Sequence, residues 1–510
     1  MNKGKFESYI MNIFQMIFLL AIIWIIILNI GFNLFNMPSV LFLQVLALVL
    51  IGYVISSYLK INIKHKKGRK KRNFTKCKLK IVNKLMLFAL FLLIFFIIAS
   101  IGLSLRVGLE NWDFATVYTS AFEYAKTGNL TRVDYFGNYP NNDFIFFIVY
   151  NLCKLMFLFH PSVGVEDGYK FMIIINSLII TISIFMIGKT AKREWKLKNM
   201  FLPLFLLTTM FPILFFSEFL YTDTLGLFFI STICYLVSRY KSDYKKISIL
   251  FCIAIFCALG YKIKAFAIII FVALIISIIV KKISEKNFLI KTGLTLGASF
   301  FSILILMNLF FSWFMPITNS EREKFEIPLA HWVAMGLNTK TNGGFFIDDL
   351  IKTRSIDGYK EKEKNSKTVI KERVRSFGKQ DLFQFLFVKK MSRTWTSGDM
   401  FTDLYALWGT KNNSGFLQKK MKDKSFERYF QFIWGMFLII VLISGFFIPK
   451  GNIFEWTMQI SIIGLIIFLT LWETNPRYLY CFIPVFYHTF FNSIMRIRES
   501  ILSRNLNILN

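Results

Sequence analysis

Charged side chains that can do chemistry stand directly beside long apolar runs in this sequence. Asp113 follows one such run and Asp223 precedes another, while Lys264 interrupts a third and Arg477 lies between the last two. A charge next to hydrocarbon costs free energy, so it is seldom there by accident. Carboxylates at such places can act as general bases or hold a metal, and Lys or Arg can bind a phosphate.

Asp113 is the first candidate for a catalytic residue. It lies in the polar stretch 106–143, directly before the segment 114–126, where alanine and aromatic residues recur at helical spacing. A carboxylate here can deprotonate or orient an acceptor hydroxyl. It can equally cap the following helix by accepting hydrogen bonds from the first N–H groups. The spacing favours neither interpretation.

The segment 134–143 is a second candidate, because it is dense in hydrogen-bonding groups at the point where the chain returns to an apolar run. Tyr139, Asn141 and Asn142 flank its proline and are candidates for substrate binding. An ordinary turn explains the same composition.

Two further carboxylates, Glu218 and Asp223, lie just before an apolar run near 224–239. They can cap that helix, or they can meet Asp113 on one membrane face and bind a divalent metal or a sugar hydroxyl. Asp113 and Asp223 are therefore the candidate metal ligands, and the sequence leaves the need for a metal cofactor open.

Basic side chains near the same membrane face are candidates for phosphate binding. Lys262 and Lys264 interrupt an apolar run, and Arg477 lies in a segment that also contains Glu473 and Tyr478. The planar fork of arginine suits a phosphate. The alternative for the lysines is that they extend to the lipid headgroups.

Composition identifies the class of protein that must position these residues. The chain is 55% hydrophobic, which is too apolar for a soluble enzyme of this length. A membrane-crossing helix needs about 20 apolar residues. The sequence therefore predicts an all-α polytopic membrane protein with a bundle of about 12–13 transmembrane segments. The candidate segments are 8–30, 38–59, 84–105, 144–159, 169–189, 200–216, 224–239, 247–260, 265–280, 291–315, 431–448, 455–472 and 478–495.

The net charge of +31 reports topology and not nucleic-acid binding, because the basic residues gather in short loops. The positive-inside rule makes those loops cytoplasmic and turns 106–143 and 316–430 outward. Thirteen crossings would leave the basic C-terminus outside, so one segment should not cross. We expect this to be 144–159, with 247–260 as the rival.

The predicted organisation follows from this topology. The predicted parts are two N-terminal transmembrane helices in 1–60, a basic cytoplasmic linker in 61–83, a membrane core in 84–315 with its first outward loop at 106–143, an extracytoplasmic loop domain in 316–430, and closing transmembrane helices with a basic cytoplasmic tail in 431–510.

Several short motifs over about residues 84–495 occur in a recognisable order. They are Asp113 in NWDFATVYTSAFEYAKTG, the turn Tyr139-Pro140-Asn141-Asn142, YTDTL at 221–225, GYKIK at 260–264, HWVAMGLN at 331–338 followed by GGFF, and a closing pattern of Glu473, Arg477, Tyr478 and Pro484. In this order they resemble the GT-C membrane glycosyltransferases, in particular bacterial members of the glycosyltransferase 39 and protein O-mannosyltransferase-like branch.

The resemblance implies a transferase that takes a sugar from a polyprenyl-phosphate-linked donor and passes it to an acceptor on the outer face. Asp113 would be the base of an inverting transfer, and Lys264 and Arg477 would bind the donor phosphate. His331 and Trp332 would contact sugar or acceptor, although a lone histidine is often structural.

The loop 316–430 contains 22 basic and 14 acidic residues, which suits an anionic acceptor or lipid headgroups but also describes an ordinary solvated surface. The expected setting is a bacterial cytoplasmic membrane, with a teichoic acid, polysaccharide, glycolipid or protein as acceptor. A flippase for lipid-linked glycans and a ligase that moves a whole glycan from polyprenyl diphosphate are the alternatives, and a scaffold is disfavoured.

Overall fold

The computed structural model describes residues 3–47, 76–105, 108–109, 112–240, 247–283, 285–408, 415–445 and 452–507. Throughout these ranges the regular elements are helices, and no strand is present among them. The predicted all-α integral membrane class is therefore confirmed. Most of the predicted basic linker 61–83 lies outside the described residues.

The first part of the chain forms the following helices. They are α1 (Lys3–Asn36), the short helix Pro38–Ala47, α3 (Lys76–Leu105), α4 (Asp113–Thr127), α5 (Val133–Asn138), η1 (Pro140–Asn142), α6 (Asp143–Phe159), α7 (Val165–Glu194), α8 (Phe201–Met210), η2 (Pro212–Leu214), α9 (Thr222–Tyr240), α10 (Ile247–Ile263), α11 (Ala267–Lys282) and α12 (Lys286–Phe314).

The remaining helices begin with a set of short ones and end with three longer ones. They are α13 (Asn319–Phe325), α14 (Leu329–Gly336), η3 (Thr339–Thr341), α15 (Ile347–Arg354), α16 (Tyr359–Ser376), α17 (Lys379–Phe383), the π-helix η4 (Gln384–Lys390), α18 (Met391–Trp395), α19 (Thr402–Leu407), α20 (Phe416–Lys422), α21 (Ser425–Gly445), α22 (Ile453–Leu471), η5 (Pro476–Phe482) and α23 (Ile483–Asn507).

Seven of the described helices are long and apolar enough to cross a membrane. They are Phe6–Asn36, Lys84–Leu105, Pro140–Phe159, Val165–Glu194, Lys286–Phe314, Ser425–Ile443 and Ile453–Leu471. The other predicted segments also fall on helices, but these are shorter or less apolar. The far end of the predicted segment 38–59 lies outside the described residues.

The expected exception among the crossings, 144–159, joins η1 to form the 20-residue helix Pro140–Phe159, which is long and apolar enough to span. Helix α8 has ten residues and ends before Pro212, which starts a 3-10 turn. At 1.5 Å per residue it covers about 15 Å, half of the hydrocarbon core. Helices α10 and α11, with 17 and 16 residues, are also short. Several described helices are thus too short for a full crossing, and which segment fails to cross stays a prediction.

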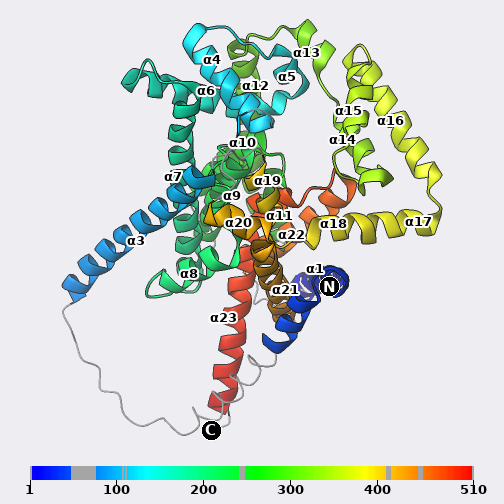
Figure 1. The fold of residues 1–510 in the computed structure, drawn as a ribbon. Helices are drawn as coiled ribbons and strands as arrows, with labels where there is room; N and C mark the ends of the chain where they lie inside the picture. Colours follow the sequence, from blue (N-terminus) through cyan, green and yellow to red (C-terminus); the bar gives the residue numbers. More distant parts are fainter. Residues whose placement is uncertain are drawn as a thin grey trace.

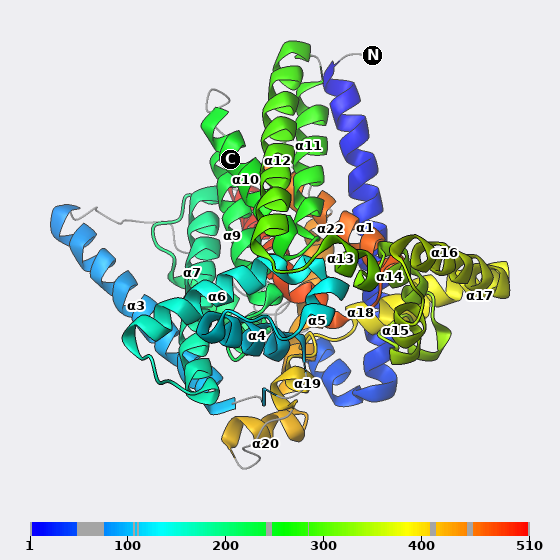
Figure 2. The same ribbon diagram turned by 90° about the horizontal axis from the view of Figure 1, so that it is seen from above.

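The membrane helices pack in pairs that come from distant parts of the chain. Helix α7 packs on α9, α10 packs on both α9 and α12, and α11 packs on α22. Gly260 lets α10 approach α9 closely, because a Cβ there would lie 3.2 Å from the Cβ of Phe229. Figure 2 shows α11 and α12 running side by side, with α1 in a similar direction.

Helices α13 to α17 form a group beside this bundle, and α15, α16 and α17 lie at one side of the molecule in both views (Figures 1 and 2). Helices α18 and α20 instead pack on membrane helices, α18 on α1 and α20 on α21. The group is tied to the rest of the protein where α13 packs on α5 and where Arg322 forms an ion pair of 2.6 Å with Asp143 at the start of α6. The end of α5 and the start of α6 therefore meet this group.

Candidate active site

Asp113 is the first residue of α4, and its side chain is not used as a helix cap. The N-cap position belongs to Trp112, which makes no side-chain capping hydrogen bond. The half-buried Asp113 carboxylate instead accepts a hydrogen bond of 3.0 Å from the Tyr135 hydroxyl. The Asp113 side chain therefore contacts a distant residue and not its own helix, and part of it stays accessible.

A chain of hydrogen bonds continues from Asp113 towards the start of α9. The Asn142 amide donates to the Tyr135 hydroxyl over 2.8 Å, and the Tyr221 hydroxyl donates to the Asn142 carbonyl oxygen over 3.4 Å. Tyr221 lies two residues before Asp223. The polar turn 134–143 and the segment before α9 thus belong to one network with Asp113.

Asp223 is buried between two cations. The Lys264 ammonium forms an ion pair with Asp223, and the Nε atom of Arg477 lies 3.7 Å from the other carboxylate oxygen. A buried carboxylate without such partners would be strongly destabilising. The structure therefore assigns Lys264 chiefly to Asp223, and it modifies the expectation that Lys264 and Arg477 serve equally as free anion ligands.

Arg477 packs against two aromatic rings. Its guanidinium carbon lies 4.7 Å from the ring centre of Trp112 and 4.7 Å from that of Tyr405. These rings stack on each other with centres 4.6 Å apart, so both contact the guanidinium from one side. The Nε and Nη1 groups make no hydrogen bond to any described residue, and Nε faces the Asp223 carboxylate. A buried guanidinium whose donors are not all used suits an anionic ligand such as a phosphate.

The loop after α22 places Glu473 next to these cations, and η5 places Tyr478 there. The Tyr478 hydroxyl donates to Glu473 over 3.1 Å, and the Lys264 ammonium lies 5.1 Å from the Tyr478 ring centre. Burial raises the pKa of Glu473 to about 7, against the opposing effect of Arg477. This carboxyl therefore changes charge near neutral pH.

The electrostatics of Asp113 follow from its surroundings. Burial raises the pKa of Asp113 above its ordinary value, while Arg477 and the Tyr135 hydroxyl oppose that shift. A carboxylate with a raised pKa is a stronger base.

Two segments between α12 and α21 hold the loop that contains Glu473 in place, directly before η5 with Arg477. The buried Lys390 ammonium donates hydrogen bonds of 2.9 Å to the carbonyl oxygens of Thr470 and Trp472, so it caps the end of α22. The backbone N–H of Thr474 donates to the carbonyl of Gly343 over 2.7 Å. The GGFF segment, which follows HWVAMGLN, thus contacts this loop through the backbone carbonyl of Gly343.

Other predicted site residues lie at the rim of this cluster. Tyr139 accepts a hydrogen bond of 3.1 Å from Arg354, and its ring lies 6.2 Å from that of Trp332. Asn141 donates to Asn142 over 3.2 Å. Tyr139, Asn141 and Trp332 therefore lie at the edge of the cluster.

Three predicted residues are placed differently from expectation. His331 is 2% exposed and its Nδ1 lies 2.8 Å from the Thr353 hydroxyl, so it is a buried structural residue and not an accessible ligand. The Glu218 carboxylate is buried and makes no hydrogen bond to a described residue. Lys262 donates to Asn308 on α12, away from Asp223. A short motif does not specify how deeply a side chain is buried or in which direction it points. These two properties keep the three residues out of the cluster.

Sequence reasoning missed several residues that complete the cluster. Trp112 and Tyr135 lie within stretches that the sequence singles out, and adjacency to Asp113 was the only signal for them. Tyr405 comes from α19 and stacks on Trp112 with ring centres 4.6 Å apart. Nothing in its local sequence marks it, because its importance comes from a long-range contact.

The candidate metal ligands do not form a metal centre in the described structure. Among the described residues, no three His, Cys, Asp or Glu side chains are grouped so that they could hold a metal ion. Asp223 already has Lys264 and Arg477 as partners. The donor set around Asp113 and Asp223 therefore does not fit a metal held by protein ligands alone.

The fold and this cluster define a polytopic, all-helical integral membrane protein with a buried polar site beside its membrane helices. The chain belongs to the family described as conserved hypothetical integral membrane protein, whose model matches residues 4–495. No curated protein and no solved structure matches the chain.

Proposed function

We propose that this protein is an integral-membrane glycosyltransferase of GT-C type. It takes a sugar from a polyprenyl-phosphate-linked donor and transfers it to a cell-envelope acceptor on the outer face of a bacterial cytoplasmic membrane. The observation that supports this most strongly is the cluster itself, in which a carboxylate, Asp113, and a guanidinium with unused donors, Arg477, share one site. The motif order that resembles GT-C enzymes supports the same reaction.

In the proposed reaction an acceptor hydroxyl oxygen attacks the anomeric carbon of the donor sugar. Its proton passes to the Asp113 carboxylate, and the bond between the anomeric carbon and the phosphate oxygen breaks. The electron pair of that bond stays on the phosphate, which leaves as polyprenyl phosphate. Attack from the face opposite the leaving group inverts the anomeric configuration, so one base is sufficient.

The cations of the site suit the leaving group. Arg477 packs against the stacked rings of Trp112 and Tyr405 and faces Asp223, so we expect it to stay in place as negative charge develops on the phosphate. Fixed charges in a dry site stabilise a transition state more effectively than mobile ones. Asp223 and Lys264 neutralise each other and hold Arg477 in position.

The test uses the purified full chain in proteoliposomes with radiolabelled polyprenyl-phosphate sugars. The wild-type protein should release polyprenyl phosphate, and Asp113→Asn should reduce the rate by about 10²–10⁴-fold. The matched control is Asp134→Asn, because Asp134 is an exposed carboxylate in the same polar stretch, paired with Arg132.

Other outcomes would contradict the proposal. Movement of a fluorescent lipid-linked glycan across the bilayer, with no release of polyprenyl phosphate from any donor, would identify a flippase. Transfer of a complete glycan from polyprenyl diphosphate, without transfer of single sugars, would identify a ligase.

A further inference from the structure

A second arginine, Arg393, lies beside the candidate active site without a partner of its own. It belongs to α18, and its buried Nε makes no hydrogen bond to any described residue. The described part of the chain also contains no ion pair of this side chain. A guanidinium stays charged in a protein, and the burial of an unpaired charge costs free energy. An anionic ligand at Arg393 would remove that cost.

The helix that carries Arg393 faces the loop after α22. Lys390, three residues before Arg393, donates a hydrogen bond of 2.9 Å to the carbonyl oxygen of Trp472. Residues three apart lie on one face of a helix, so Arg393 points towards the same loop. The residue that follows Trp472 in this loop is Glu473.

Electrostatics place two arginines near the Glu473 carboxyl group. Burial raises the pKa of Glu473 to about 7, and the charges of both Arg477 and Arg393 oppose that shift. Burial lowers the pKa of Arg393, and the Glu473 carboxylate opposes this second shift. Such effects weaken with distance. Arg393 and Arg477, which come from different parts of the chain, therefore lie in one site with Glu473.

The backbone of Gly344 positions the Arg393 guanidinium. A Cβ atom at residue 344 would lie 2.7 Å from Nη2 and 2.8 Å from Nε of Arg393, so glycine leaves the room that this group occupies. The neighbouring Gly343 carbonyl accepts a hydrogen bond of 2.7 Å from the backbone N–H of Thr474. The segment 343–344 thus contacts both Arg393 and the loop that contains Glu473, and it holds the two together.

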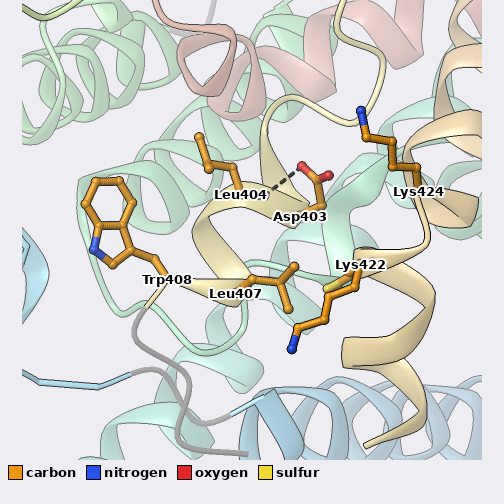
Figure 3. Close-up of a pocket in the computed structure, with 7 residues that line it drawn as sticks. Asp403, Leu404, Leu407, Trp408, Lys422 and Lys424 are labelled. Carbon is orange, nitrogen blue, oxygen red and sulfur yellow. Dashed lines mark hydrogen bonds between the residues drawn. The ribbon is translucent and has the colours of Figure 1, made fainter. Parts of the chain in front are cut away.

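The pocket between α19 and α20 offers no comparable pair of cations (Figure 3). Lys422 and Lys424 line this pocket, but their ammonium groups point in opposite directions. Lys424 also has Glu427 as a partner at 3.8 Å. One anion would therefore not meet both lysines, and the pocket is no alternative to the two arginines.

We propose that Arg393 is a second phosphate ligand of the candidate active site and binds the donor phosphate together with Arg477. The inference rests on the proposed transferase function and adds a donor-binding residue to it. Both guanidiniums have nitrogens without hydrogen bonds, and a phosphate has enough oxygen atoms for two planar donors. Arg393 is only partly buried, so a ligand can reach it. Its role is binding alone, and it takes no part in proton transfer.

The first test measures binding by calorimetry on the purified full chain in detergent, with farnesyl phosphate as the probe and farnesol as its uncharged match. The wild-type protein should bind the phosphate at least about tenfold more tightly than the alcohol. Arg393→Gln should weaken the binding of farnesyl phosphate by about tenfold or more and leave that of farnesol unchanged. Arg393→Lys keeps the charge and loses the planar fork, so its affinity should fall between these two.

Arg375→Gln is the matched control, because it removes an exposed arginine of α16. It should change neither affinity. If Arg393 only balances the charge of Glu473, Arg393→Gln will weaken both ligands equally or neither, and either result would overturn the assignment. If melting curves show that Arg393→Gln is unfolded, Arg393→Lys decides. A wild-type ratio of the two affinities in that variant would also overturn the assignment.

The second test separates this phosphate ligand from the proposed reaction. In the transfer assay, Arg393→Gln should raise the KM for the polyprenyl-phosphate donor and leave the KM for the acceptor unchanged. A rise in the acceptor KM alone would mean that Arg393 binds the acceptor, which contradicts the donor assignment. If transfer is present and neither KM responds, the inference is wrong and the transferase stands. If farnesyl phosphate binds through Arg393 and no donor reacts, the transferase proposal is wrong and the phosphate site stands.

Discussion

The Arg477 guanidinium stands 4.7 Å from the ring centre of Trp112, the residue that directly precedes Asp113. This contact joins two segments from opposite ends of the chain, and it brings the candidate base and the candidate phosphate ligand into one site. The ring of Tyr405, which stacks on Trp112, lies at the same distance from the guanidinium. Arg477 is therefore fixed by stacking as well as by its proximity to Asp223.

Replacement of Arg477 by lysine tests whether the planar guanidinium group is needed to bind the donor phosphate. Arg477→Lys retains the positive charge but loses the stacked, two-donor geometry. We expect the kcat/KM for the polyprenyl-phosphate donor to fall by about 10–100-fold, since a charged hydrogen bond contributes about 1.5–3 kcal/mol. Arg375→Lys on the exposed surface of α16 is the control. A variant with wild-type kinetics would remove Arg477 from the phosphate site.

The hydroxyl of Tyr135 tunes Asp113. Tyr135→Phe removes a hydrogen bond that lowers the pKa of Asp113, so that pKa should rise further. A base works only when deprotonated, and activity is lost as pH falls through its pKa. The acidic limb of the transfer rate should therefore move to higher pH, with a similar rate at the plateau. An unchanged pH profile in Tyr135→Phe would show that Asp113 is not the titrating base.

Glu473 should make stability depend on pH. Burial raises its pKa to about 7, above the 4.5 of a free glutamate. Below the lower value the carboxyl is protonated in both states, and between the two values folding retains a proton that the unfolded chain releases. Stability therefore falls as pH rises through this window. Glu473→Gln should lose this dependence.

The measurement is the melting temperature of the detergent-solubilised protein from about pH 5 to about pH 8. The wild-type protein should become less stable relative to Glu473→Gln as pH rises across this range. Glu323→Gln, at an exposed position, should follow the wild-type curve. Parallel curves for the wild type and Glu473→Gln would mean that Glu473 has an ordinary pKa.

Lys390, at the end of η4, should hold this part of the chain against α22. Lys390→Met removes its two hydrogen bonds to carbonyl oxygens at the end of α22, which should destabilise the protein by about 1–3 kcal/mol. Melting temperature and limited proteolysis between residues 316 and 430 report the loss. The exposed neighbour Lys389 provides the matched control, Lys389→Met. Equal protease resistance in the two variants would contradict this role.

Several residues of the candidate site could be predicted from the sequence one at a time. Asp113, Asp223 and Arg477 stand out because charge beside an apolar run is rare. Their partners do not stand out in the same way. Tyr405 lies in a short segment with no distinctive pattern, and the burial of His331 depends on how α14 packs on its neighbours.

The sequence by itself determined the class of this protein, because runs of apolar residues long enough for a bilayer specify membrane helices directly. It also determined which polar residues lie at the ends of those helices. Only the tertiary structure decided that Lys264 pairs with Asp223, that Asp113 bonds Tyr135 and does not cap α4, and that Tyr405 packs on both Trp112 and Arg477. These relationships depend on packing between distant segments, and local sequence patterns do not encode such contacts.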